Sequence, residues 1–347
     1  MNRKRIITFI VILGMGIGLF FTYSFYRIFF KPNTAFSNEE SYVFIENEFR
    51  FQDVVNELEN LLISVDDFKI AAQKKGYNLR IKGGKFVLKK GLNNHEIVNV
   101  LRGDSAPVRV IFNNQERLEN LAGRVAQQIA PDSLSLLNAF RDTKFLKSNG
   151  FNEKSALSMY LPNSYDFFWN TSPEGFRDRM LKEYKRFWNL ERIEKAKALN
   201  LSPIEVISLA AIVQKETAKV DERKKIAGVY LNRLKKRMNL DADPTVVYSL
   251  REKYQNFDTI IRRVLRKDLK IVSPYNTYKN KGVPPGPITM PDFSSIKAVL
   301  NPETHNYLYF VANPKEPGYH TFARTYTAHI RNSRIYHRWI NSQRLFR

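Results

Sequence analysis

One glutamate is distinguished by its place on a predicted helix. Glu216 continues an apolar stripe at helical offsets of three, four and seven residues. The stripe consists of Leu209, Ile212 and Val213. This placement desolvates part of the carboxylate, which raises its pKa and favours the protonated form that a general acid needs near neutral pH. From periodicity alone, a surface ion pair of Glu216 with Lys219 or Arg223 is an equally good interpretation.

Little other chemistry is open to this sequence. The absence of cysteine excludes disulfides, thiolate nucleophiles and zinc sites that need sulfur. The sequence contains no HExxH motif, P-loop, GxGxxG or serine nucleophile elbow, and the spacing of its five histidines indicates no metal. We therefore expect neither a metal nor a cofactor.

Local signals predict the elements that must position Glu216. Its helix begins at a capping box, in which Ser202 is the cap, Pro203 occupies the first turn and Glu205 completes the box. A second helix is expected from about residue 221 to 236. Asp243, followed by a proline, is interpreted as the cap of a third helix.

A proline-rich segment follows these helices. Residues 273–291 contain five prolines and two glycines, which predicts a stiff irregular loop of the kind that walls binding clefts.

Size and charge indicate a large basic protein. The 347 residues suffice for two or three folded units, and the 43% of hydrophobic residues can supply a packed core. The 56 Lys and Arg exceed the 34 Asp and Glu, giving a net charge of +22, so an anionic partner is expected. Nucleic acid, acidic lipid and anionic polymers are all anionic partners of the kind that this net charge indicates. No RRM, KH or helix-turn-helix signature is present, and we do not expect nucleic acid to be the partner.

The N-terminus predicts a membrane anchor. Residues 6–26 are uncharged and apolar, a run of 21 when about 20 residues cross a bilayer. A cleaved signal peptide is the alternative, but its apolar region is typically about 7 to 15 residues and no small-x-small cleavage site follows this run. The three cations at positions 3–5 hold the tail in the cytoplasm. Everything after Lys31 is then expected outside the cytoplasmic (inner) membrane, or in the periplasm, on a single-pass anchor.

We expect an α+β fold in which a transmembrane helix precedes a small α/β subdomain and a mixed, mainly helical domain. The expected boundaries are 1–31 for the tail and anchor, 32–40 for a linker, 41–104 for the subdomain and 105–347 for the larger domain. The subdomain reads strand, helix, helix, strand, and the chain from about 115 to 198 reads as helical with breaks at prolines and a glycine.

Spaced motifs over about 115 residues resemble the YceG-like family. In chain order they are Ala211-Ile-Val-Gln-Lys-Glu216-Thr217, Ile226-Ala-Gly-Val-Tyr-Leu-Asn232-Arg233-Leu234, Asp243-Pro244-Thr245-Val246, Tyr275-Asn276-Thr277-Tyr278, Gly282-Val-Pro-Pro285-Gly286, Asn301-Pro302, Tyr307-Leu-Tyr-Phe310-Val311 and His320-Thr321-Phe322. The agreement of several motifs in the same order makes a chance match improbable.

The resemblance implies a membrane enzyme whose LysM-like peptidoglycan-binding subdomain precedes a YceG-like catalytic domain. It implies an endolytic transglycosylase that cleaves the MurNAc-GlcNAc bond within glycan strands, leaves 1,6-anhydroMurNAc ends and acts in cell-wall synthesis and remodelling. The catalytic residue implied is Glu216. Further positions that match family motifs are candidate substrate-binding residues: Asn232, Asp243, Thr245, Tyr275, Asn276 and His320.

One position departs from the family. The motif is often written E-K-E-T, and this chain has Gln214 at its first position, which suggests that a second carboxylate there is dispensable. The partners implied are peptidoglycan glycan strands and the membrane, with peptidoglycan synthases as candidate protein partners. The alternative is a non-catalytic peptidoglycan-binding scaffold, against which the intact Glu216 in a full motif argues.

Overall fold

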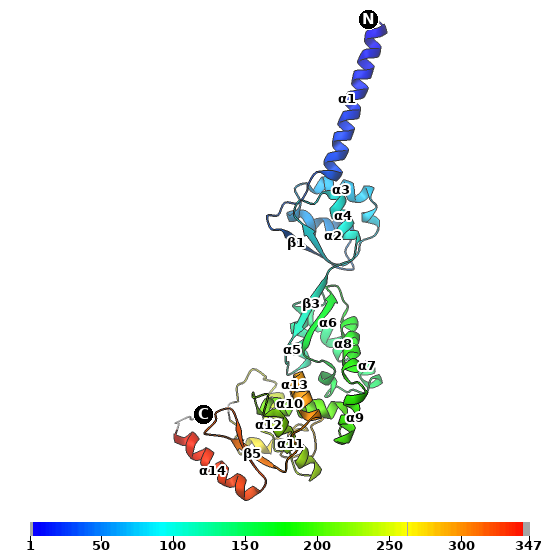
Figure 1. Ribbon diagram of the computed structural model, residues 1–347. Coiled ribbons are helices and arrows are strands. Elements are labelled where there is room, and N and C mark those ends of the chain that lie inside the picture. Colours follow the sequence, from blue (N-terminus) through cyan, green and yellow to red (C-terminus); the bar gives the residue numbers. More distant parts are fainter. Residues whose placement is uncertain (1–2, 262, 343–347) are drawn as a thin grey trace. The chain divides into compact units, whose positions relative to one another are not determined.

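A computed structural model describes residues 3–261 and 263–342 (Figure 1). The chain forms two compact units. The first consists of Met1–Val110 with Ala126–Pro131 and Tyr165–Ser172, and the second holds the remainder. The elements are helical apart from three two-stranded sheets among the described residues, so the predicted α+β class is confirmed.

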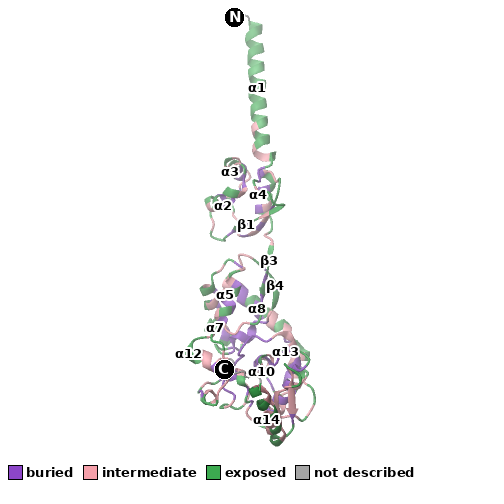
Figure 2. Ribbon diagram, turned by 90° about the vertical axis from the view of Figure 1, so that its left-hand side faces the viewer, coloured by how far each residue is buried: buried purple, intermediate pink, exposed green. Residues whose placement is uncertain are grey.

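The first unit begins with α1 (Arg3–Phe30), a helix of 28 residues. Its most apolar window has a mean hydropathy of 2.3, and none of its residues is buried, as Figure 2 shows. A helix of this length spans a bilayer core of about 30 Å. The predicted apolar run is therefore a continuous helix that is compatible with a membrane anchor.

A small α/β subdomain follows α1. Its elements are β1 (Glu40–Ile45), α2 (Phe51–Leu58), α3 (Val65–Lys74), β2 (Gly84–Lys89) and α4 (Asn94–Arg102), with short 3-10 turns at Glu59–Leu61 and Tyr77–Leu79. The two strands pair antiparallel, and alternate side chains such as Val43 and Phe86 point into the core. The predicted order of strand, helix, helix, strand is confirmed.

The segment expected to be a linker, 32–40, is bonded to this subdomain. The side chain of Asn33 accepts a hydrogen bond from the Ser64 amide (2.7 Å) and donates one to the Ser64 carbonyl (2.8 Å). Thr34 Oγ1 accepts a bond from the amide of Gly91 (2.7 Å). Both Asn33 and Thr34 are buried, so the segment is part of the folded unit.

The chain then forms β3 (Pro107–Phe112), which pairs with β4 (Asn163–Phe168). Between and after these strands lie α5 (Leu118–Ala126), α6 (Ser133–Phe140), α7 (Thr143–Ser148), a 3-10 turn at Ala156–Met159, α8 (Pro173–Phe187) and α9 (Leu190–Ala198). The helical stretch predicted for 115–198 is confirmed except at β4, which the pattern missed.

The elements around the candidate site belong to the second unit. They are α10 (Pro203–Glu216), α11 (Arg223–Lys235), α12 (Asp243–Tyr254), a 3-10 turn at Asp268–Lys270, α13 (Phe293–Leu300), the hairpin of β5 (Tyr309–Ala312) and β6 (His320–Ala323), and α14 (Tyr326–Ser342). Residues 273–291 lie outside helices and strands, as predicted.

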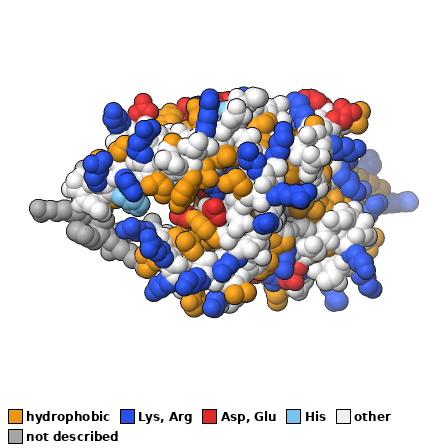
Figure 3. Space-filling view, turned by 90° about the horizontal axis from the view of Figure 1, so that it is seen from below, with side chains coloured by type: hydrophobic (Ala, Val, Ile, Leu, Met, Phe, Trp, Pro, Cys, Tyr) orange, Lys and Arg blue, Asp and Glu red, His pale blue; other side chains and the backbone are white. Residues whose placement is uncertain are grey.

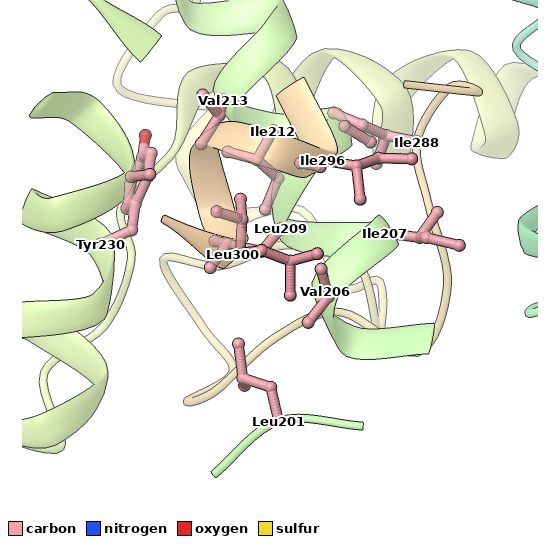
Figure 4. Close-up of a cluster of buried hydrophobic side chains, with 14 of the residues drawn as sticks. Leu201, Val206, Ile207, Leu209, Ile212, Val213, Tyr230, Ile288, Ile296 and Leu300 are labelled. Carbon is pink, nitrogen blue, oxygen red and sulfur yellow. The ribbon is translucent and has the colours of Figure 1, made fainter. Parts of the chain in front are cut away.

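The centre of this unit is α10. Eight consecutive residues, 206–213, are buried, and all of them except Ser208 belong to a hydrophobic cluster that includes side chains of α11 and α13 (Figure 4). Each fully buried aliphatic side chain contributes roughly 1.5 to 3 kcal/mol. The predicted capping box is present, because Ser202 Oγ accepts a bond from the Glu205 amide and the Glu205 carboxylate accepts one from the Ser202 amide. The helix that carries Glu216 is thus fixed at its start and along its length.

Candidate active site

Glu216 is the last residue of α10 and lines a cavity of about 840 Å³. Asp243 and Tyr248 of α12, Ile288 of the proline-rich loop and Tyr336 of α14 are also part of its lining. Figure 3 shows a hollow in one face of the molecule with acidic side chains inside it and hydrophobic and basic side chains around it. Volumes of this size accommodate small-molecule or sugar-sized ligands.

Tyr230 of α11 holds the Glu216 carboxyl group. Its hydroxyl donates a hydrogen bond of 2.6 Å to Glu216 Oε1. Tyr230 is 1% exposed, and its ring packs edge-to-face against Phe310 with centroids 5.9 Å apart. Oε2 accepts no hydrogen bond from the residues that the structure describes, which leaves this oxygen for a ligand in the cavity.

The surroundings of Glu216 tune its acidity. Burial raises the pKa of Glu216 to about 7, and the charge of Asp243 adds to this effect. The hydrogen bond from Tyr230, and more weakly the His320 and Arg233 side chains, lower the pKa and oppose the rise. The side chain is only half-buried, because it faces the cavity. Both protonation states are therefore populated near neutral pH, as acid–base catalysis requires.

The ion-pair interpretation of Glu216 is not what the structure shows. Arg223 pairs with Asp292 at 2.7 Å, and the Lys219 ammonium lies over the ring of Tyr319, 4.9 Å from its centroid. Neither cation neutralises Glu216, and its role as a general acid stays a prediction.

Asp243 is not a helix cap, which corrects the sequence interpretation. Ala242 occupies the cap position of α12, and Asp243 is the first helical residue without a capping bond. The Ala242 amide donates to Thr277 Oγ1 (2.9 Å), so a distant threonine braces the start of this helix. The Asp243 carboxylate instead accepts a bond of 2.6 Å from the hydroxyl of Tyr278 and lines the same cavity as Glu216.

Three other predicted residues brace the proline-rich loop. Thr245 Oγ1 lies 2.9 Å from Thr277 Oγ1, and the Asn276 amide donates to the Ile271 carbonyl (2.8 Å). The buried ring of Tyr275 contacts Tyr248, which lines the cavity. All three side chains are buried, and contact of any of them with a substrate remains a prediction.

His320 and Asn232 connect the β5–β6 region to α11. The ring of His320 lies 2.7 Å from a carboxylate oxygen of Glu222, whose other oxygen accepts the His320 amide at 2.7 Å. Burial raises the pKa of Glu222, but these hydrogen bonds outweigh burial and lower it overall. Asn232 donates to the carbonyls of His305 (2.8 Å) and Tyr307 (3.1 Å). Neither His320 nor Asn232 lines the cavity.

Sequence reasoning missed an ion-pair bridge in the cavity wall. Glu116 Oε1 lies 2.6 Å from Lys215 Nζ, and Glu116 Oε2 lies 2.8 Å from Arg251 Nη1. The three residues come from distant parts of the chain, and no local pattern indicates their contact. In residues 3–261 and 263–342, no group of three or more His, Asp and Glu side chains has the arrangement of a metal site.

Gln214 has a structural contact of its own. Its side-chain oxygen accepts bonds from the Asp292 amide (2.6 Å) and the Ser295 hydroxyl (3.1 Å) at the start of α13. A glutamate oxygen, as in the family motif, can accept the same bonds, so the departure at this position preserves the contact.

Comparison with known proteins agrees with these motifs. The model of the YceG-like family matches residues 43–335. An endolytic murein transglycosylase of Bacillus subtilis is 31% identical over 276 residues, which cover 73% of this chain and 74% of the relative. An endolytic murein transglycosylase of Streptococcus pneumoniae is 34% identical over 171 residues, which cover 49% of this chain and 30% of the relative.

A solved structure is similar as well. The crystal structure of a YceG-like protein of Listeria monocytogenes superimposes with a TM-score of 0.56 at 28% identity, covering 85% of this chain and 99% of that chain. The family match spans far more than half of the sequence and includes Glu216 and every other predicted site residue. This chain belongs to the YceG-like family.

Proposed function

We propose that this protein is an endolytic peptidoglycan transglycosylase with Glu216 as its catalytic residue. The observation that carries the proposal is a half-buried carboxyl group of pKa about 7, held by Tyr230 and facing a cavity of about 840 Å³. The relatives named endolytic murein transglycosylases support the same substrate class.

In the first step the protonated Glu216 gives its proton to the glycosidic oxygen that links MurNAc C1 to GlcNAc. The C1–O bond breaks, GlcNAc leaves with a free hydroxyl, and positive charge develops at C1. The substrate's own acetamido group stabilises this charge. Because Tyr230 occupies Oε1, Oε2 is the oxygen that delivers the proton.

In the second step the Glu216 carboxylate removes the proton from the C6 hydroxyl of MurNAc. The C6 oxygen attacks C1 and closes the 1,6-anhydro ring, and Glu216 is protonated again. No water is consumed. The same residue acts first as acid and then as base, a role for which a pKa near the working pH is best suited.

Hydrolysis is the alternative reaction, and the position of Asp243 gives it a specific basis. A glycoside hydrolase uses two carboxyl groups about 5 to 9.5 Å apart, the second to activate water or to form a covalent intermediate. Asp243 shares the cavity with Glu216, so a second carboxylate is at hand. In the proposed reaction its charge instead maintains the raised pKa of Glu216.

Product analysis separates the two reactions. Long glycan strands are digested in water enriched in heavy oxygen, and the fragments are examined by mass spectrometry. A transglycosylase gives fragments that lack one water and carry no label. Labelled reducing ends as the dominant product would establish hydrolysis, and intact strands would support the scaffold alternative.

We propose that α1 anchors the enzyme in the cytoplasmic membrane with the body outside, and that residues 41–104 are a LysM-like subdomain that binds peptidoglycan. The apolar α1 and the cations before it support this topology. New strands are assembled at this surface, so peptidoglycan synthases are the proposed partner class. Protease added to spheroplasts should digest the body, whereas digestion only after membrane rupture would refute the orientation.

A further inference from the structure

Positive and negative side chains both line the cavity. Its acidic residues are Glu216, Asp243 and Glu116, and its basic residues include Lys215, Arg251 and Arg263. Glu116 is bonded to two of these cations, whereas Asp243 is bonded to Tyr278 and Glu216 to Tyr230. The group of Glu116, Lys215, Arg251 and Arg263 is called the cationic wall below.

The internal ion pairs leave the cationic wall with surplus positive charge. Glu116 places one oxygen 2.6 Å from Lys215 and the other 2.8 Å from Arg251, so one negative charge opposes two positive charges. Arg263 is exposed and has no hydrogen-bond or ion-pair partner among the described residues. Three cations and one carboxylate therefore leave a formal charge of about +2 on these four residues, which the Asp243 carboxylate in the same cavity reduces to about +1 while Glu216 is protonated.

The ion pairs of the cationic wall preorganise its cationic side chains for binding an anion. The Glu116, Arg251 and Lys215 side chains are 23%, 19% and 39% exposed, so the bridge is half-buried and its two ion pairs constrain these long side chains. Ordering before binding reduces the entropy that a ligand must offset. Guanidinium groups also match the planar geometry of a carboxylate, to which they donate two parallel hydrogen bonds.

We infer that the cationic wall binds a carboxylate carried by a MurNAc residue of the glycan strand. This inference rests on the proposed function and specifies how its substrate is recognised. The hydroxyl and acetamido groups of the glycan backbone are neutral. The charge available near the cleaved bond is a carboxylate, either on the free lactyl group of a MurNAc or on the peptide attached to it.

A variant of Arg263 tests this inference without disturbing an internal contact. Arg263→Met removes the charge and keeps an unbranched apolar stem. Arg266→Met is the matched control, because Arg266 is exposed in the same loop and does not line the cavity. The full-length protein in detergent is given three substrates: strands with free lactyl groups, strands that carry peptides, and peptide-free strands whose carboxyl groups have been converted to neutral amides.

We expect Arg263→Met to raise the KM by roughly 10- to 100-fold for the strands whose carboxylate is bound, with kcat little changed, as for a lost hydrogen bond to a charged group. On amidated strands the wild type and Arg263→Met should have equal KM values. A rise with peptide-free strands identifies the lactyl carboxylate, and a rise confined to peptide-bearing strands identifies the peptide.

If the wild type and Arg263→Met have equal KM values on both charged substrates, or if Arg266→Met raises the KM as much as Arg263→Met does, the inference is overturned. Cleavage of these substrates by the wild type would still leave the proposed function standing. A wild-type protein that cleaves none of the three substrates would instead overturn the proposed function. The two failures are therefore distinguishable in one set of assays.

Discussion

The hydroxyl of Tyr230 lies 2.6 Å from Glu216 Oε1 and donates a hydrogen bond to it. Tyr230 lies inside α11 and is almost fully buried, whereas Glu216 ends α10 and faces the cavity. The contact fixes the direction of the carboxyl group and leaves its second oxygen open. The geometry of the proposed acid thus depends on how two neighbouring helices pack.

Tyr230→Phe should lower kcat by roughly tenfold, the cost of one hydrogen bond to a charged group. A hydrogen bond donated to a carboxylate stabilises its charged form, so losing it raises the pKa of Glu216 further. The alkaline limb of the pH–rate profile should then move to higher pH. Tyr319→Phe is the control, since that hydroxyl bonds Asp221 and does not line the cavity. An unchanged limb would show that the contact does not tune the acid.

Asp243→Asn should shift the same limb in the opposite direction. The Asp243 charge raises the pKa of Glu216, and the neutral amide removes this effect while its oxygen can still accept the Tyr278 bond. Glu216 then loses its proton at lower pH, and activity at neutral pH falls because less of the acid form remains. Asp221→Asn is the matched control outside the cavity. A limb that stays in place would mean that Asp243 acts on the substrate instead.

The sequence predicts the helix α10 and the face of that helix on which Glu216 lies, because both are local properties. The capping box lies within four residues, and the apolar stripe repeats with the helical period, so neither needs knowledge of the fold. The strand, helix, helix, strand order of the subdomain is predictable for the same reason.

The missed contacts depend on residues that only the folded chain brings together. Glu116 and Lys215 form an ion pair although they are 99 positions apart in the sequence, and no periodicity links them. Asp243 has the residue type of a cap, but it lies one position too late, because Ala242 occupies the cap position and the Asp243 carboxylate accepts the Tyr278 hydroxyl. Local propensity identifies which groups are available, and tertiary packing decides which of them are used.

Gln214→Ala should lower the free energy of unfolding clearly but should lower the rate of turnover only slightly. Its side-chain oxygen accepts two hydrogen bonds at the start of α13, and leaving these donors unpaired costs about 1 to 3 kcal/mol of the free energy of unfolding. Gln214→Glu keeps an acceptor there and should be milder. Urea unfolding and turnover of both variants check this, and a loss of activity equal to that of Glu216→Gln would make Gln214 part of the catalytic machinery.

Glu216→Gln should lower cleavage by roughly 100-fold to 10,000-fold, the usual contribution of general acid–base catalysis. The amide retains the shape of the side chain and can accept the Tyr230 bond, but it cannot transfer the proton. Binding of purified peptidoglycan, measured by sedimentation, should stay close to that of the wild type. Near-normal turnover would move the catalytic assignment to another residue, whereas lost binding would point to a damaged fold.

The same substitution should change how stability depends on pH. The pKa of Glu216 rises from 4.5 to about 7 on folding, so the folded state binds this proton more tightly than the unfolded state. The stability of the wild type linked to Glu216 is fully present below pH 4.5 and is lost as the pH rises to 7, by up to about 3 kcal/mol. Glu216→Gln has no such loss, so its stability relative to the wild type should increase between pH 4.5 and 8.

Urea unfolding at both pH values measures the difference, with Glu194→Gln at an exposed site on α9 as the control. A relative stability that is the same at both pH values would mean that the carboxyl group keeps an ordinary acidity in the folded protein, and the general-acid assignment would lose its physical basis.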